Sequence, residues 1–133
     1  MVGPEAEREP GVRAFGDLFV AGARLSVPFG AVIVRKGYGL GAMAMAAGGF
    51  KSNTFTIAWP SGEIGPMGLE GAVRLGYSKE LGAIADPGER PQREQELIAA
   101  EYERGKAMSA AMVFDVDDVI DPALTREWIR TLL

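Results

Sequence analysis

The sequence predicts an α/β fold in which helices flank a parallel β-sheet. Segments with helical spacing alternate with short apolar segments along the chain, and glycine-rich turns lead from strand to helix. The apolar run "SVPFGAVIV" (26–34) has no polar alternation, which is typical of a strand buried on both faces of a parallel sheet. A chain of 133 residues has room for one hydrophobic core, so we expect residues 1–133 to form a single domain.

The first helix is expected to begin at Glu5 and to end around Ala23. Its apolar positions recur at helical spacing, whereas charged residues such as Arg8 and Asp17 occupy the other positions. The apolar positions are Val12, Phe15, Leu18, Phe19 and Gly22.

A glycine turn and a second helix follow the strand at 26–34. The stretch "VRKGYGLGAMAMAAGG" (34–49) steps through glycines and then becomes rich in Ala and Met. We expect a small-residue helix over "GAMAMAA" (41–47), stopped by Gly48 and Gly49.

The segment "NTFTIAWP" (53–60) is the second predicted strand. Its Thr, Phe and Ile residues favour β structure, and Pro60 closes it. The loop "SGEIGPMG" (61–68) then leads into a helix over 69–84. The apolar positions of that helix are Leu69, Val73, Leu75, Leu81 and Ile84.

After a break at "ADPGERP" (85–91), a charged amphipathic helix is expected over 92–112. Its apolar side comprises Leu97, Ile98, Tyr102 and Met108. The segment 113–121 is a short third strand or an extended segment. A last helix closes the chain, with Asp121 as N-cap and Pro122 at the first helical position. Its apolar face is Leu124, Trp128, Ile129 and Leu132.

The composition excludes several kinds of function. The chain has 18 Asp and Glu against 14 scattered Lys and Arg, a net charge of −4, so nucleic-acid binding has no electrostatic support. Without Cys or His there is no disulfide, no thiolate or imidazole metal site and no serine triad. No apolar stretch is long enough to span a membrane, and the N-terminus lacks the apolar core of a signal peptide. We therefore expect a cytoplasmic protein.

The glycine turn has two interpretations that the residue types leave open. Gly37, Gly39 and Gly41 remove every second side chain, so a ligand could approach the free amides of the following helix and bind there as an anion. The alternative is that the glycines only allow the helix to pack closely against the sheet.

Dinucleotide binding is a further alternative. Gly37, Gly39 and Ala42 satisfy the G-x-G-x-x-G/A pattern, but Trp59 and Pro60 stand where its confirming acid belongs. The glycine spacing of a nucleoside triphosphate loop is missing. An oxyanion hole of backbone amides would suit a protein that has no imidazole.

The acidic cluster and the bulky residues have ordinary structural explanations. Asp115, Asp117 and Asp118 are expected to be solvated, because the segment lacks the central Gly and the distal Glu of a calcium loop; we expect no metal. The two Trp residues are expected to pack in a core or an interface. Met43, Met45 and Met67 are core residues or line an acyl or cofactor pocket.

Three long stretches resemble the carboxyltransferase subunits of biotin-dependent acyl-CoA carboxylases, of the propionyl-CoA and acetyl-CoA carboxylase type. They are "VRKGYGLGAMAM", "FTIAWPSGEIGPMGLEGAVRLGYSKEL" and "DVDDVIDPALTREWI". The resemblance covers nearly the whole chain and supersedes the dinucleotide interpretation.

The resemblance implies a crotonase-like fold built from turns of a ββα superhelix. It also implies transfer of a carboxyl group from carboxybiotin to the α-carbon of an acyl-CoA. Of the family's two domains, this chain is similar to the C-terminal one, which mainly holds biotin. The implied oxyanion hole is the backbone of Gly39, Leu40, Gly41 and Ala42, and the implied biotin-binding residues are Gly37, Tyr38, Met43 and Met67.

The implied partners are an acyl-CoA-binding carboxyltransferase half, a biotin carrier protein, the acyl-CoA substrate and further copies of the chain. Because the family's active site forms between two domains, we expect activity only when the acyl-CoA half is present, and Met1 to be a boundary within a longer polypeptide. The alternative is a non-catalytic fragment or assembly module. We expect exposed apolar surface along Val12, Phe15 and Phe19, and around Trp59, Met67 and Leu69.

Overall fold

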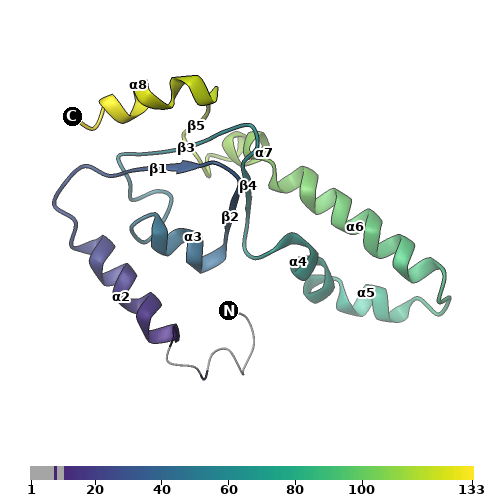
Figure 1. The fold of residues 1–133 in the computed structure, drawn as a ribbon. Coiled ribbons are helices and arrows are strands. Elements are labelled where there is room, and N and C mark those ends of the chain that lie inside the picture. Colours follow the sequence, from purple (N-terminus) through teal and green to yellow (C-terminus); the bar gives the residue numbers. More distant parts are fainter. Residues whose placement is uncertain (1–7, 9–10) are drawn as a thin grey trace.

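The computed structural model describes residue 8 and residues 11–133, and its elements alternate between helices and short strands (Figure 1). The part of the expected first helix before residue 11 lies almost wholly outside the described residues. In chain order the elements are α2 (Gly11–Ala23), β1 (Gly30–Ile33), β2 (Lys36–Tyr38), α3 (Gly39–Met45), β3 (Phe55–Ala58), β4 (Glu63–Gly65), α4 (Leu69–Gly76), α5 (Ser78–Ala83), α6 (Glu89–Gly105), α7 (Ala107–Met112), β5 (Asp118–Val119), η1 (Pro122–Leu124) and α8 (Thr125–Arg130).

The main sheet confirms the predicted parallel arrangement. Its strand order is β1-β3-β5, with Gly30 opposite Phe55 and Ile57 opposite Asp118, and both pairings are parallel. All four residues of the central strand β3 are buried. The prediction that the 26–34 strand is buried on both faces was wrong, because β1 lies at the edge of the described sheet and is mostly half-buried.

A second sheet lies where the sequence predicted a turn and a loop. Strands β2 and β4 pair in parallel, with Lys36 opposite Glu63 and Tyr38 opposite Gly65. At the start of β4, the Glu63 N–H donates to the Arg35 carbonyl over 2.6 Å. This small sheet sets the position of the glycine-rich segment, because Gly37 belongs to strand β2 and not to a free turn.

Two of the predicted helices are each divided in two. The helix predicted over 69–84 becomes α4 and α5, which meet at Tyr77. The helix predicted over 92–112 begins earlier, at Glu89, and breaks at Lys106, whose backbone is extended. The break follows from tertiary pairing: Lys106 bridges Glu63, and the Ala107 N–H donates to the Gly62 carbonyl over 2.9 Å.

The hydrophobic core consists of three clusters of buried side chains. One cluster packs helix α7 against the sheet, and a second packs helix α8 over the other side of β3. In the second, the rings of Phe55 and Trp128 meet edge to face with centroids 5.3 Å apart, so the half-buried Trp128 packs against the core. The third cluster joins α4, α5 and α6 into an arm that extends from the sheet (Figure 1).

Several predicted apolar positions are not buried. Leu75 is exposed because it lies on the face of α4 opposite the buried Leu69 and Val73. Met108 is exposed on α7, and Leu69, expected at the surface, is buried. In α2, Phe15 and Leu18 are exposed and Phe19 is half-buried; the side chain of Val12 lies outside the described residues.

The described helices include none that is long and apolar enough to cross a lipid bilayer.

Candidate functional site

The site is built around the junction between β2 and α3. Helix α3 begins at Gly39, two residues before the predicted start, with Tyr38 as its N-cap. Gly39 turns the chain with a φ of +60°, and a Cβ there would stand only 2.7 Å from the Pro66 carbonyl oxygen. Glycine is therefore required at this position for two reasons, the left-handed backbone and the contact with the chain after β4.

Backbone amides at the start of α3 are free of helical partners. In a helix that begins at Gly39, the Ala42 amide is the first with a helical acceptor, the carbonyl of Tyr38. The Gly39 amide donates to the Gly65 carbonyl in the ladder with β4, so the amides without an acceptor are those of Leu40 and Gly41. Tyr38 gives no side-chain cap to α3. No described atom lies within 4 Å of the place where a Cβ at Gly41 would be, so the backbone is open on that side.

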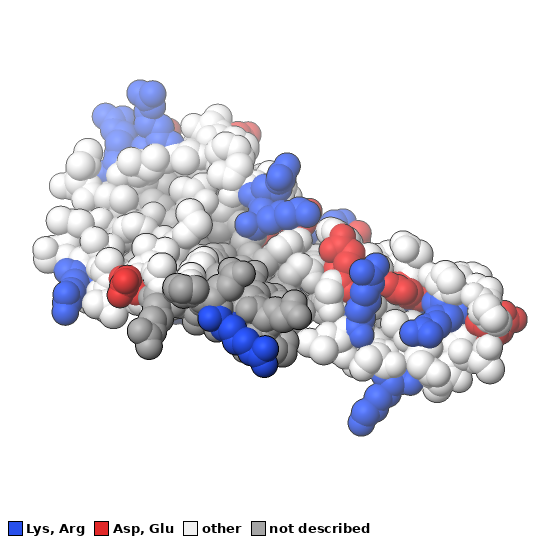
Figure 2. Space-filling model, turned by 60° about the horizontal axis from the view of Figure 1, so that its bottom comes forward, with Lys and Arg blue, Asp and Glu red and all other residues white. Residues whose placement is uncertain are grey.

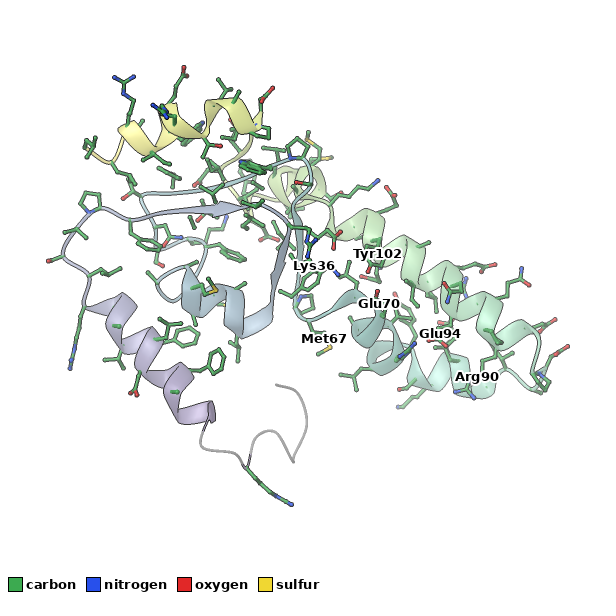
Figure 3. The ribbon with its side chains drawn as sticks, in the orientation of Figure 1. Lys36, Met67, Glu70, Arg90, Glu94 and Tyr102 are labelled. Carbon is green, nitrogen blue, oxygen red and sulfur yellow. The ribbon has the colours of Figure 1, made fainter. Side chains whose placement is uncertain are left out.

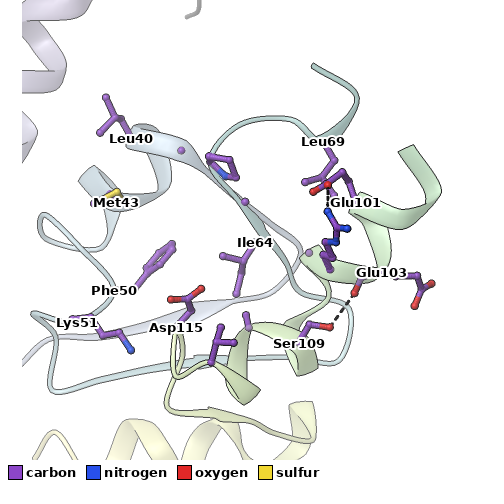
Figure 4. A pocket seen from close by; sticks show the side chains of 17 residues that line it. Leu40, Met43, Phe50, Lys51, Ile64, Leu69, Glu101, Glu103, Ser109 and Asp115 are labelled. Atoms are coloured by element: carbon purple, nitrogen blue, oxygen red, sulfur yellow. Dashed lines mark hydrogen bonds and ion pairs between the residues drawn. The ribbon is translucent and has the colours of Figure 1, made fainter. Parts of the chain in front are cut away.

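A hollow of about 1040 Å³ borders this helix start (Figure 4). Of the predicted site residues, Gly39, Leu40 and Met43 line it. Gly37 and Ala42 instead line a smaller hollow of about 520 Å³ beside β1. Tyr38, Gly41 and Met67 line neither of these two.

The other walls of the larger hollow come from residues that the sequence analysis did not assign to a site. Phe50, Ile64, Pro66 and Leu69 make it mainly apolar. The segment 101–115 closes it, since the break at Lys106 turns α7 back toward β4. A signal was present in Gly105, a buried glycine inside a helical pattern: a Cβ there would stand 3.0 Å from a Leu69 side-chain carbon and 3.1 Å from the Ile64 carbonyl.

Charged groups of both signs line the hollow, Lys51 and Arg104 together with Glu101, Glu103 and Asp115. Arg104 contacts Glu101 at 2.6 Å, and the hydroxyl of Ser109 donates to the backbone carbonyl of Glu103 at 2.9 Å (Figure 4). Such pairs continue along the arm, where Lys and Arg alternate with Asp and Glu instead of forming a patch of one sign (Figure 2). The rim thus adds little net charge to an apolar hollow bordered by free amides.

The structure contains two tyrosine–carboxylate pairs, one within the small sheet and one within the arm. The Tyr38 hydroxyl donates to Glu63. The Tyr102 hydroxyl donates to Glu70 over 2.5 Å, and Figure 3 labels both of these residues. Burial and then the bond to Glu63 raise the pKa of Tyr38 well above its usual range. The bond to Glu70 raises the pKa of Tyr102, and the same bond lowers the pKa of Glu70. Both phenols therefore stay protonated donors at neutral pH.

The acidic segment before α8 has structural roles. The Asp121 carboxylate accepts from the Ala123 N–H at 2.8 Å, which confirms the predicted cap. Asp117 was expected to be only solvated, but its carboxylate accepts from the Thr56 N–H at 2.6 Å and so ties the β5 segment to β3. Across the residues described here, no group of three or more Asp or Glu is placed to hold a metal ion.

The dinucleotide interpretation does not fit this geometry. Its first glycine, Gly37, lies inside strand β2, where a Cβ would stand 3.2 Å from an Ile33 methyl. Trp59, at the place of the confirming acid, packs in the α8 cluster and donates its indole N–H to Thr125. The glycine at 37 therefore serves close packing.

Comparison with known proteins gives a consistent result. The family model described as "Carboxyl transferase domain" matches residues 1–132. The chain is 36% identical over 126 residues to the putative propionyl-CoA carboxylase beta chain of Bacillus subtilis, an alignment that covers 93% of this chain and 24% of that protein. The chain spans about a quarter of the length of the curated relatives it matches.

Solved structures agree over the full length of the chain. A single-chain, multi-domain long-chain acyl-CoA carboxylase matches with a TM-score of 0.83 and 59% identity, covering 100% of this chain and 13% of that one. The transcarboxylase 12S subunit, a hexamer solved with methylmalonyl-CoA and methylmalonic acid bound, matches with a TM-score of 0.82 and 34% identity, covering 100% of this chain and 25% of that one.

Proposed function

The chain belongs to the carboxyl transferase domain family, and from this premise we propose that it is the biotin-side component of an acyl-CoA carboxylase. In this role it moves a carboxyl group from carboxybiotin to the α-carbon of acetyl-CoA or propionyl-CoA. Its fold is the crotonase-like α/β fold of the related carboxyltransferase subunits. Residues 1–133 then act as one domain, equivalent to the C-terminal domain of those subunits.

The observation that supports this role most directly is the hollow beside α3. One side of the hollow is formed by the glycine-rich segment that resembles the carboxyltransferase family, and another side is formed by apolar residues of β4 and α7. Biotin combines a polar ureido ring with an aliphatic tail. The residues present fit such a group, because free amides border one side of the hollow and apolar side chains form most of the rest.

The proposed contacts are residues that line the hollow or border it. Leu40 and Met43 hold the apolar part of the ring and tail. The amides of Leu40 and Gly41 donate to the ureido oxygen. The Gly39 amide is left out because it pairs with the Gly65 carbonyl, and the Ala42 amide because Tyr38 already accepts its hydrogen bond. Bound carboxybiotin supplies the carboxyl group. Amides fixed before the reaction stabilise negative charge on that oxygen, and losing one such donor costs about 10²–10³-fold in rate.

The proposed partners follow from the same family. They are an acyl-CoA-binding half, a biotin carrier protein, the acyl-CoA itself and further copies of this chain. Assembly into a hexamer is stated for the transcarboxylase 12S subunit, and we extend only the expectation of an oligomer to this chain. A cytoplasmic location is part of the proposal.

Reconstitution tests the proposed function. The chain is co-expressed with the acyl-CoA-binding half of a related carboxyltransferase, and decarboxylation of malonyl-CoA or methylmalonyl-CoA is followed with and without free biotin. We expect activity only when both halves and biotin are present, with each half alone as control. A stable complex of the two halves without turnover would instead support a non-catalytic assembly module.

A further inference from the structure

Two neighbouring walls of the main hollow come from elements that meet through a very short ladder. Helix α3 supplies Gly39, Leu40 and Met43, and the β4 segment supplies Ile64, Gly65 and Pro66. Strands β2 and β4, which join these walls, have only three residues each. A ladder of three residues does little by itself to fix the orientation of β2 relative to β4. Side-chain contacts at the end of the ladder therefore help to set the relative position of the two walls.

Tyr38 makes such a contact at the end of the ladder. It is both the last residue of β2 and the N-cap of α3, and its hydroxyl donates to the Glu63 carboxylate on β4. Its ring lies over Gly65, its partner in the ladder, where a Cβ would stand 3.7 Å from a ring carbon. The hydroxyl of Tyr38 thus contacts Glu63 at the start of β4, and its ring contacts Gly65 at the end of β4.

Glu63 is a fixed partner for this phenol. Its N–H donates to the Arg35 carbonyl at 2.6 Å, and its backbone also bridges Lys106, which begins the segment leading into α7. A displacement of Glu63 would therefore disturb β2 and the α6–α7 break together. Lys36, on the same face of β2, lies with its ammonium 6.0 Å from the centre of the Tyr38 ring.

We propose that Tyr38 and Glu63 are a positioning pair that holds α3 and β4 at the relative placement needed for carboxyl transfer in the hollow. Neither side chain lines the hollow, so the pair acts through the walls and not on the substrate. The inference rests on the proposed function. It gives Tyr38 a role different from the biotin contact expected from the sequence.

Steady-state kinetics of the reconstituted two-half enzyme test the pair. Tyr38→Phe and Glu63→Ala are expected to lower kcat by about 10-fold or more, because small misplacements of reacting groups are costly, with the acyl-CoA KM within about 2-fold. Glu63→Gln keeps an oxygen that accepts from the phenol and should retain most of the activity. Tyr102→Phe removes the analogous bond to Glu70 away from α3 and is the matched control.

Amide hydrogen exchange provides a measurement that needs no activity. In the chain itself, Tyr38→Phe should speed exchange of the α3 amides by about 10-fold, since a hydrogen bond to a charged group is lost, while Tyr102→Phe leaves them unchanged. The proposed positioning role would be contradicted if exchange of the α3 amides were unchanged in Tyr38→Phe. It would also be contradicted if Tyr38→Phe and Tyr102→Phe lowered kcat equally. An inactive wild-type enzyme with the expected exchange pattern would overturn the proposed function, while the structural contact by which Tyr38 and Glu63 hold α3 against β4 would be supported.

Discussion

Gly39 is the residue on which the geometry of the helix start depends most. Its φ of +60° costs an L-residue roughly 1–2 kcal/mol, and a Cβ would also meet the Pro66 carbonyl oxygen at 2.7 Å. We therefore expect Gly39→Ala to lower the free energy of unfolding by about 2 kcal/mol or more. Urea denaturation followed by circular dichroism measures this.

Gly41→Ala is the matched comparison for that experiment, because the space beside Gly41 is open. Alanine is about 0.5–1 kcal/mol better than glycine within a helix, so this variant should be neutral or stabilising. Equal destabilisation by the two substitutions would contradict the description of this junction.

The Glu70–Tyr102 bond gives a pH-dependent prediction. The bond lowers the pKa of Glu70, so its stabilising contribution is present above the unfolded pKa and is lost as the pH falls through the lowered folded value. Tyr102→Phe should raise the pKa of Glu70 toward its ordinary value. Carboxyl ¹³C shifts followed during an acid titration measure this, and an unchanged Glu70 titration in the variant would show that the bond does not form in solution.

At the scale of elements, the final helical segment depends on one capping residue. The Asp121 carboxylate satisfies the Ala123 N–H at the start of η1, and α8 follows directly to cover β3. Replacing a capping Asp by Ala costs about 0.5–2 kcal/mol, so Asp121→Ala should lower the unfolding free energy by that amount. Thermal unfolding measures it, with Asp115→Ala as the nearby acidic control, which should change it much less.

The sequence predicted those elements whose signals are local. Strand β3 combines β-favouring residues with Pro60 just beyond its end, and the Asp-Pro start of the last segment is a capping signal over adjacent residues. Strands β2 and β4 have no such signal. They are strands because Lys36–Tyr38 and Glu63–Gly65 find each other across the chain, and neither alone has strand composition.

The same distinction explains which part of the site was predicted. Gly39, Leu40 and Met43 belong to one continuous motif, so sequence reasoning placed them at a ligand site and the structure places them on the hollow. The opposite wall depends on the break at Lys106. That break arises from backbone pairing with Glu63, and local periodicity predicts an unbroken helix there.

At the scale of the whole molecule, apolar side chains remain uncovered. Leu40, Met45, Met112 and Phe114 are each at least 70% exposed, on α3 and at the end of α7. Large apolar areas at a surface mark interaction sites, so we expect this chain to self-associate. Sedimentation velocity at tens of micromolar should show dimers or larger species, and a clean monomer throughout that range would argue against an oligomer.

Binding of NAD separates the carboxyltransferase account from the dinucleotide alternative. A dinucleotide site carries its phosphate-binding turn within one βαβ unit and would bind NAD without a partner. Because Gly37 lies inside a strand here, we expect no saturable NAD binding at millimolar concentration by calorimetry. Tight, saturable NAD binding by this chain alone would overturn the carboxyltransferase assignment.

The most direct test of the central claim is the activity of Gly41→Val in the reconstituted two-half enzyme. The substitution places a side chain in open space beside the free amides, so the chain should fold and pair while biotin-dependent decarboxylation falls by about 10²–10³-fold. Gly82→Val, on α5 and equally free of neighbours, is the control and should keep wild-type activity. A folded, paired Gly41→Val enzyme with activity within about 2-fold of wild type would contradict the claim that these amides stabilise the charge that develops during carboxyl transfer.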